Sequence, residues 1–209
     1  MPALTFAALD WHTAAMPGSN GPVELARLPA LEDNAFRAFV RFPPGWSRLG
    51  AGYYAVPEEF MVLEGDLTLN GRTWHAGGYA WIQAGRVRTG SRSTAGCLAF
   101  AWFGGSPRWV VGDAPAPATD VDVQLAHWRD APLSDLGDGL HARVMRAGTE
   151  HSTWVVEEAA LGKLVNLGVA CEALSLVDHA WTWNEPADAT ASRGGALLVR
   201  TRSDFARRE

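Results

Sequence analysis

The sequence predicts an all-β, antiparallel fold in which one β unit occurs twice. Short apolar runs of strand length are separated by Gly, Pro, Asn and Asp, and many alternate apolar with polar or small residues. Asn70-Gly71 lies between two such runs and suits a two-residue hairpin turn, in which both central residues need positive φ. A related order of features on either side of a Pro-rich segment favours two copies of the unit.

The predicted strands of the first half follow one another at short intervals, at residues 37–42, 60–63, 67–69, 79–82 and 97–103. Only 156–164, which is rich in Glu, Ala, Leu and Lys, favours a short helix, and Gly162 weakens that preference.

A domain boundary is predicted at residues 113–120. Pro115 and Pro117 remove backbone donors there and disfavour regular structure on either side. Residues 26–28 (Ala-Arg-Leu) before this segment correspond to 142–144 (Ala-Arg-Val) after it. We therefore expect an N-terminal module over 1–112, a Pro/Ala linker over 113–120 and a C-terminal module over 121–209.

The composition favours a packed protein with a small-molecule partner. Hydrophobic residues make up 47% and charged residues 20%, and the formal net charge is −5. A net negative charge does not favour binding to nucleic acid or to an anionic membrane. The start of the chain lacks the basic and apolar regions of a secretion signal, and Cys97 and Cys171 lie far apart in apolar contexts. We expect a cytoplasmic protein with buried thiols.

Two stretches share a regular spacing of glycines and polar residues. Gly45 is followed after five residues by 51–53 (Ala-Gly-Tyr), then after four by Glu58 and after six by Gly65. Further along, Gly77 is followed after five residues by 83–85 (Gln-Ala-Gly), then after two by Arg88 and after three by Arg92.

This spacing resembles the two motifs of the cupin superfamily. The first cupin motif runs Gly, five residues, His-x-His, three or four residues, Glu, six residues, Gly. The second runs Gly, five residues, Pro-x-Gly, two residues, His, three residues, Asn. The resemblance covers about fifty residues, 43–93, and extends to the second half through the repeat. It implies double-stranded β-helix (jelly-roll) cupin barrels, two in one chain, the second with degenerate motifs. Cupins commonly pair through sheet edges, which makes a homodimer an expectation.

The resemblance also identifies the positions at which cupins usually bind a metal. Two His and a Glu of the first motif and a His of the second are the usual ligands, and these positions hold Ala51, Tyr53, Glu58 and Arg88. An arginine stays protonated and offers only donors, so it cannot coordinate a cation. We therefore expect no metal and no other cofactor, with Glu58 and Arg88 forming an ion pair or a shared anion-binding site.

Other polar and aromatic residues near the motifs are candidates for substrate binding. Tyr53 and Tyr54 follow each other on the strand that normally supplies His-x-His, and alternate strand residues face opposite sides, so one of them can pack outside. Gln83 replaces the usual proline. Of the six histidines, none forms a recognisable metal-binding pair, and His75 is closest to the motifs. Tryptophans could line a pocket or fill the core, and those of the first module are Trp46, Trp74, Trp81 and Trp102.

The favoured interpretation is a metal-independent isomerase, cyclase or lyase that acts on a small organic metabolite, such as a carboxylate or carbonyl compound. Glu58 would move a proton, Arg88 would hold a carboxylate or enolate oxygen, and Tyr53 would hydrogen-bond the substrate. The alternative is a non-catalytic cupin that binds a metabolite or has a structural role. A metal-dependent dioxygenase with unusual ligands such as His75 is a weaker alternative.

Overall fold

The computed structural model describes residues 4–31, 34–113, 122–137, 139–149, 151–157, 160, 171–183 and 195–202. The chain forms two compact units, the first of residues Asp10–His127 and the second of Met1–Leu9 together with Trp128–Glu209. The elements with described bounds are eighteen strands and two short 3₁₀ helices, η1 (Phe6–Ala8) and η2 (Trp128–Asp130). The predicted all-β fold class is confirmed.

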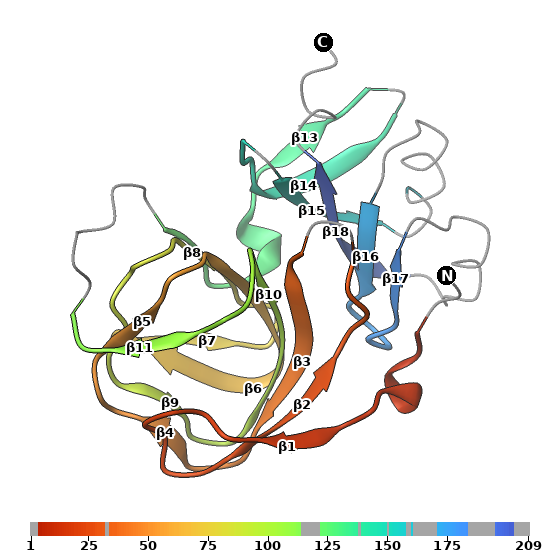
Figure 1. Ribbon diagram of the computed structural model, residues 1–209. Helices are drawn as coiled ribbons and strands as arrows, with labels where there is room; N and C mark the ends of the chain where they lie inside the picture. The colour runs from red at the N-terminus through yellow and green to blue at the C-terminus, as the bar shows by residue number, and fades with distance from the viewer. Residues whose placement is uncertain are drawn as a thin grey trace. The chain divides into compact units, whose positions relative to one another are not determined.

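The first unit contains a curved antiparallel sheet (Figure 1). Its strand order is β1 (His12–Ala14), β2 (Val23–Arg27), β3 (Phe36–Phe42), β10 (Cys97–Phe103), β6 (Glu58–Leu69), β8 (Tyr79–Ile82) and β12 (Val123–Leu125). Five further strands complete the unit. β4 (Trp46–Arg48) pairs with β9 (Ser91–Ser93), β5 (Gly52–Tyr54) pairs with β11 (Trp109–Val111), and β7 (Arg72–His75) pairs with β6. The apolar core of the unit lies between these strands and the inner face of the large sheet.

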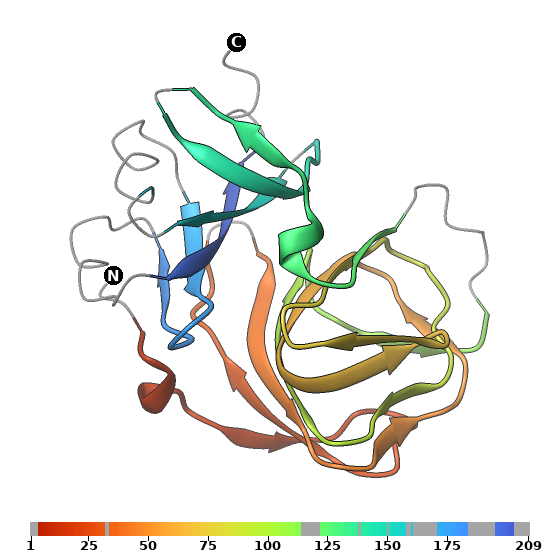
Figure 2. The ribbon, with the colours of Figure 1, turned by 180° about the vertical axis from the view of Figure 1, so that it is seen from behind.

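The hairpin predicted at Asn70-Gly71 is present between β6 and β7, which Figure 2 shows from behind. Asn70 has φ 50° and Gly71 has φ 77°, as a two-residue turn of this kind requires. Leu69 and Arg72 are directly paired across the turn.

The second unit contains a six-stranded antiparallel sheet. The strand order is β13 (Leu133–Asp135), β14 (His141–Arg146), β15 (His151–Glu157), β18 (Ala196–Arg202), β16 (Cys171–Ser175) and β17 (Trp181–Trp183). In chain order this is the same arrangement as β1, β2, β3, β10, β6 and β8 of the first unit. One face carries an apolar core that includes Trp154, Val199 and Cys171.

The units divide the chain differently from the predicted modules at two points. β12 lies beyond the predicted linker, yet it pairs with β8 because the edge of the first sheet offers it free backbone groups. Near the N-terminus, Leu4 forms a bridge with Trp181 and so belongs to the second unit. Residues 114–120, all of the predicted linker except Asp113, lie outside the described residues.

The helix predicted over 156–164 is not present at its start, because Val156 and Glu157 end strand β15. Ala160 is helical, and the other residues of 158–164 lie outside the described residues. Within the described chain, no helix has the length and apolar character needed to cross a bilayer.

Candidate functional site

The first unit holds a cavity of about 380 Å³ with mostly apolar walls. Side chains of β2, β3, β6 and β10 form these walls. The charged and hydroxyl-bearing side chains on the lining are Arg48, Tyr54, Glu58, Arg88, Ser91 and Arg108. An apolar cavity into which a few polar groups converge is typical of small-molecule sites.

Glu58 and Arg88 are in direct contact at this cavity. Glu58 is the first residue of β6, and Arg88 lies between β8 and β9, so their meeting depends on the fold of the whole unit. Arg88 Nη1 donates to Glu58 Oε2, and both residues are buried. Arg88 Nε is also buried and has no hydrogen-bond partner. Arg88 therefore keeps one donor free while it satisfies Glu58.

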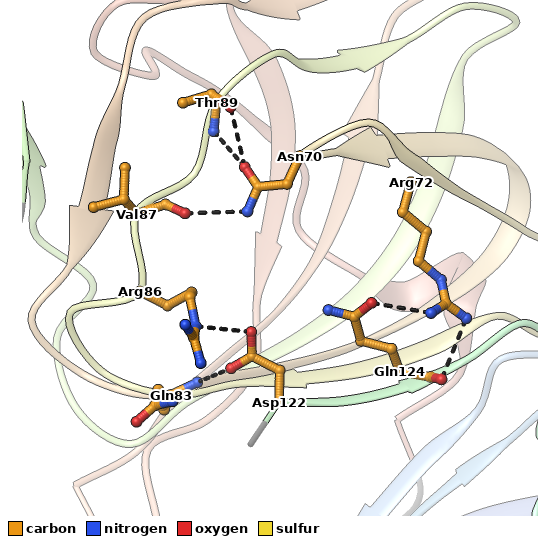
Figure 3. Close-up of polar contacts among 8 residues, drawn as sticks. All are labelled: Asn70, Arg72, Gln83, Arg86, Val87, Thr89, Asp122 and Gln124. Atoms are coloured by element: carbon orange, nitrogen blue, oxygen red, sulfur yellow. Dashed lines mark hydrogen bonds and ion pairs between the residues drawn. The ribbon is translucent and has the colours of Figure 1, made fainter. Parts of the chain in front are cut away.

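The segment that carries Arg88 is held on both sides by the side chain of Asn70 (Figure 3). Asn70 Nδ2 donates to the carbonyl oxygen of Val87 at 3.1 Å, and the backbone N–H of Thr89 donates to Asn70 Oδ1 at 2.6 Å. Arg88 itself exchanges backbone hydrogen bonds with Gly52, of 2.8 and 3.2 Å. The sequence predicted Asn70 only as a turn residue, and its second role depends on the folded loop.

Strand β5 presents Tyr54, rather than Tyr53, to the cavity. Tyr54 is buried on the lining, whereas Tyr53 is half-buried, absent from the lining and paired with Val110. Gly52 shares the face of Tyr54, and the space that its Cβ would need is filled by the ring of Trp109. The inward positions are thus 52 and 54, one residue away from the 51 and 53 of the motif alignment. Of the two tyrosines, Tyr54 lies at the cavity, and Tyr53, for which a hydrogen bond to substrate was predicted, does not.

Four other predicted binding residues do not line the cavity. Trp81 and Trp102 are both paired with Glu59, so they share its face of the sheet, and Glu58 points to the opposite face. Gln83 is buried, and its backbone N–H donates to Asp122 (Figure 3). His75 is exposed on β7.

The sequence left open whether the tryptophans line a pocket or fill the core, and Trp46 and Trp74 differ in this respect. Trp46 lies on the cavity lining, whereas Trp74 packs edge-on against Phe60 in the core.

Arg48 is the site residue that sequence reasoning missed. It lies on β4 with 4% of its surface exposed, and Nη1 donates to the hydroxyl of Tyr54 at 3.3 Å. Its guanidinium carbon is 3.5 Å from the ring centroid of Trp109. The sequence could have indicated Arg48 through the alternation of side chains along β4, which places Arg48 on the same face as Trp46.

The cavity lining carries more positive than negative charge. Three arginines and one glutamate face it, although the whole chain has a net charge of −5. Burial lowers the pKa of Arg88 to about 10, while Tyr54 and Asp122 raise this pKa and the nearby Arg48 lowers it. Arg88 is therefore still protonated at neutral pH.

The residues at the four cupin metal-ligand positions do not fit a divalent metal. Ala51 has no donor atom, the side chain of Tyr53 is off the cavity lining, and Arg88 brings a positive charge to Glu58. Among the described residues, no three His, Cys, Asp or Glu side chains form a group that could bind a metal.

The fold can be compared with solved structures, whereas no family model and no curated protein matches this sequence. A candidate dioxygenase from Nostoc punctiforme superposes with a TM-score of 0.70 at 14% identity, over 95% of this chain and 81% of its own. Protein YlbA from E. coli superposes with a TM-score of 0.57 at 12% identity, over 96% and 89%. This chain therefore shares its all-β, jelly-roll-like fold with these two proteins. A candidate glyoxylate-induced protein from Pseudomonas aeruginosa is also similar in fold, with a TM-score of 0.52 at 11% identity over 91% of this chain and 84% of its own.

Proposed function

We propose that the first cupin unit acts on a small carboxylate or carbonyl compound as a metal-independent isomerase, cyclase or lyase. The observation that carries this proposal is the contact of Glu58 with Arg88 on the lining of an apolar cavity. By the motif resemblance, this carboxylate and this guanidinium stand at two of the four positions from which cupins usually bind a metal. Together they supply a proton acceptor and a fixed positive charge, which suffice for proton transfer next to a carbonyl group.

In the proposed reaction, Glu58 removes a proton from the carbon next to the carbonyl or carboxylate group of the substrate. The electron pair of the broken C–H bond moves onto the substrate oxygen, and this enolate oxygen accepts hydrogen bonds from Arg88. Arg88 Nε, which has no partner in the protein, is the donor available for it. Tyr54 takes the hydrogen-bonding role predicted for Tyr53, since its hydroxyl lies at the cavity beside Arg48. In a substrate with a C=C bond next to this enolate, the C=O bond re-forms, the electron pair moves to the far carbon of the conjugated system, and Glu58 delivers the proton there, which completes an isomerisation.

A non-catalytic binding role is the second candidate, and the burial of both Glu58 and Arg88 favours it. Their mutual contact satisfies one charge with the other, so the pair could serve only to stabilise the fold. The dioxygenase alternative has less support. Although the similar protein from Nostoc punctiforme is a candidate dioxygenase, His75 is exposed and off the lining, so it adds no metal ligand at the cavity.

Hydrogen–deuterium exchange at carbon tests the catalytic proposal with simple probe compounds in place of the natural substrate. The protein is incubated in D₂O with phenylpyruvate and 2-oxobutanoate, and loss of the C3 proton signal is followed by NMR. We expect exchange above the buffer rate, and Glu58→Gln should abolish it. Glu24→Gln, which removes an exposed carboxylate paired with Arg41, should leave it unchanged. Equal rates for Glu58→Gln and the wild type contradict the role of Glu58.

Elemental analysis of the purified protein tests the metal-independent part of the proposal. We expect less than about one-tenth of an equivalent of Fe, Mn, Ni, Cu or Zn, because the four ligand positions offer a single metal-binding side chain. One equivalent of a tightly bound transition metal contradicts the proposal.

A further inference from the structure

We propose that Arg48, together with Tyr54 and Trp109, is the subsite that binds the carboxylate group of the ligand. The ligand class is then a small monocarboxylic acid with a flat or branched apolar body. This inference rests on the proposed function in that it places the ligand in the same cavity. It adds the substrate class and a residue that determines specificity.

The first support is the unbalanced charge of Arg48. Among the described residues, no carboxylate lies within ion-pair distance of it, and its Nε is buried without a hydrogen-bond partner. The contacts it makes are with the neutral hydroxyl of Tyr54 and with the rings of Trp109, Tyr54 and Trp46. A guanidinium at 4% exposure is costly to bury without an anionic partner, so an anion that enters the cavity gains that partner.

The second support is the difference between the two buried arginines of the cavity. Arg88 is engaged with Glu58, whereas Arg48 is paired with neutral groups alone. The buried charges on the lining are therefore two positive and one negative, and a single carboxylate brings them to balance. The third lining arginine, Arg108, is exposed, so in the buried part of the cavity a dicarboxylate would leave an excess negative charge. The charge balance thus selects a monocarboxylate.

The third support is the chemistry of the remaining walls. Phe60, Phe103, Leu67, Leu69 and Ala99 face the cavity, and the space of about 380 Å³ lies near the lower end of the range for ligand sites. The ring of Trp109 covers the guanidinium of Arg48 on one side and limits the approach of the carboxylate to its edge, where the donors are. A small acid with an apolar body fills this space, whereas a sugar or nucleotide would bury many unpaired hydroxyls.

Binding of matched acids and amides tests the subsite, with benzoate against benzamide and cinnamate against cinnamamide as probes. Trp46 and Trp109 line the cavity, so binding can be followed by tryptophan fluorescence and confirmed by calorimetry. For the wild type we expect each acid to bind about ten- to a hundredfold more tightly than its amide, as a charge-assisted hydrogen bond predicts. Arg48→Met should remove this preference, and Arg48→Lys should restore part of it.

Arg41→Met is the matched control, because Arg41 is exposed, paired with Glu24 and absent from the lining. Its acid preference should equal that of the wild type. Thermal unfolding checks that Arg48→Met is folded, and if it is not, Arg48→Lys and the acid-to-amide ratio of the wild type still decide the matter. The proposal is overturned if no acid binds saturably, if acid and amide bind equally, or if Arg48→Met retains the preference.

The outcomes separate this inference from the proposed function. If an acid preference depends on Arg48 but no carbon–hydrogen exchange occurs with wild-type protein, the subsite stands and the catalytic proposal fails. If exchange depends on Glu58 but acids have no advantage over amides, catalysis stands and the assignment of Arg48 fails.

Discussion

The two units of the chain have the same order of six strands, and each buries an arginine close to a glutamate. In the first unit, Glu58 begins a strand and Arg88 lies on a loop, and both face the cavity. In the second, Glu172 and Arg200 are directly opposed on β16 and β18, with Nη1 and Oε2 3.9 Å apart. Their neighbours Cys171 and Val199 belong to the core, so the pair points to the other face of the sheet.

The pair of the second unit has a structural role, whereas the pair of the first unit is placed where it can contact a ligand. The indole N–H of Trp181 donates to Glu172 Oε1 at 2.9 Å, so the carboxylate of the second unit has a further partner within its own sheet. Beside the first pair lie a cavity and a second, unbalanced arginine. The same strand order is therefore compatible with both uses, and the side chains around the pair make the difference.

The largest predicted effect is the removal of one partner from the first pair. Glu58→Leu leaves Arg88 buried without a carboxylate and should lower the free energy of unfolding by about 3–5 kcal/mol. The double variant Glu58→Leu/Arg88→Met should recover most of this loss, because apolar groups of similar volume often replace buried ion pairs well. Urea denaturation measures both. A single variant within about 0.5 kcal/mol of the wild type would show that the pair is not buried as described.

A second prediction concerns the close approach of Gly52 and Trp109. Gly52→Ala places a methyl group where the ring of Trp109 lies and close to the backbone oxygen of Val110, so the ring and the paired strand must shift, at a cost of about 1–3 kcal/mol in unfolding free energy. The same shift should weaken acid binding, because Trp109 covers Arg48. Gly50→Ala is the matched control, since its Cβ meets no atom, and it should be neutral. Equal stability of the two variants contradicts the packing of Trp109 on Gly52.

A third, smaller effect is expected from the loop contacts of Asn70. Asn70→Gly keeps a residue suited to φ 50° but removes the hydrogen bonds to Val87 and Thr89, and should cost about 1–2 kcal/mol of unfolding free energy. Acid binding should weaken as well, because Arg88 lies between these two contacts. Asn70→Asp keeps the acceptor for Thr89 and should lose less. If Asn70→Gly and the wild type unfold at the same urea concentration, the side chain does not hold the loop.

The smallest predicted effect concerns the reactivity of the two thiols, Cys97 in the first unit and Cys171 in the second. Burial raises the pKa of Cys97 to about 12 and that of Cys171 to about 11, with nearby carboxylates adding to both shifts. Below these values each thiol stays protonated, so at pH 8 under about 1% of either is the reactive thiolate. We expect native protein to react slowly with a disulfide reagent such as Ellman's, and urea-unfolded protein to react with both thiols at once. Rapid reaction of one thiol in native protein would contradict its burial.

The sequence predicted the fold class and the Asn70-Gly71 hairpin, because these depend on residue type and period. The meeting of Glu58 with Arg88 was predicted from the resemblance to the cupin motifs. The sequence could not decide which of Tyr53 and Tyr54 faces the cavity, because a spacing motif specifies which strand supplies a residue but not which face that residue occupies. A slip of one residue moves every side chain of a strand to the other face. Arg48 was missed for a related reason, since its importance comes from what it lacks, a carboxylate partner, and only the folded chain reveals that.

The bond from Thr89 N–H to Asn70 Oδ1 gives a loop amide the kind of protection that usually belongs to a sheet. Solvent exchange at this amide requires opening of the contact to the β6–β7 turn, so its rate reports on the turn. Slow hydrogen exchange at the Thr89 amide would therefore report that the loop beside the cavity is intact. This exchange rate can be measured by NMR without any ligand.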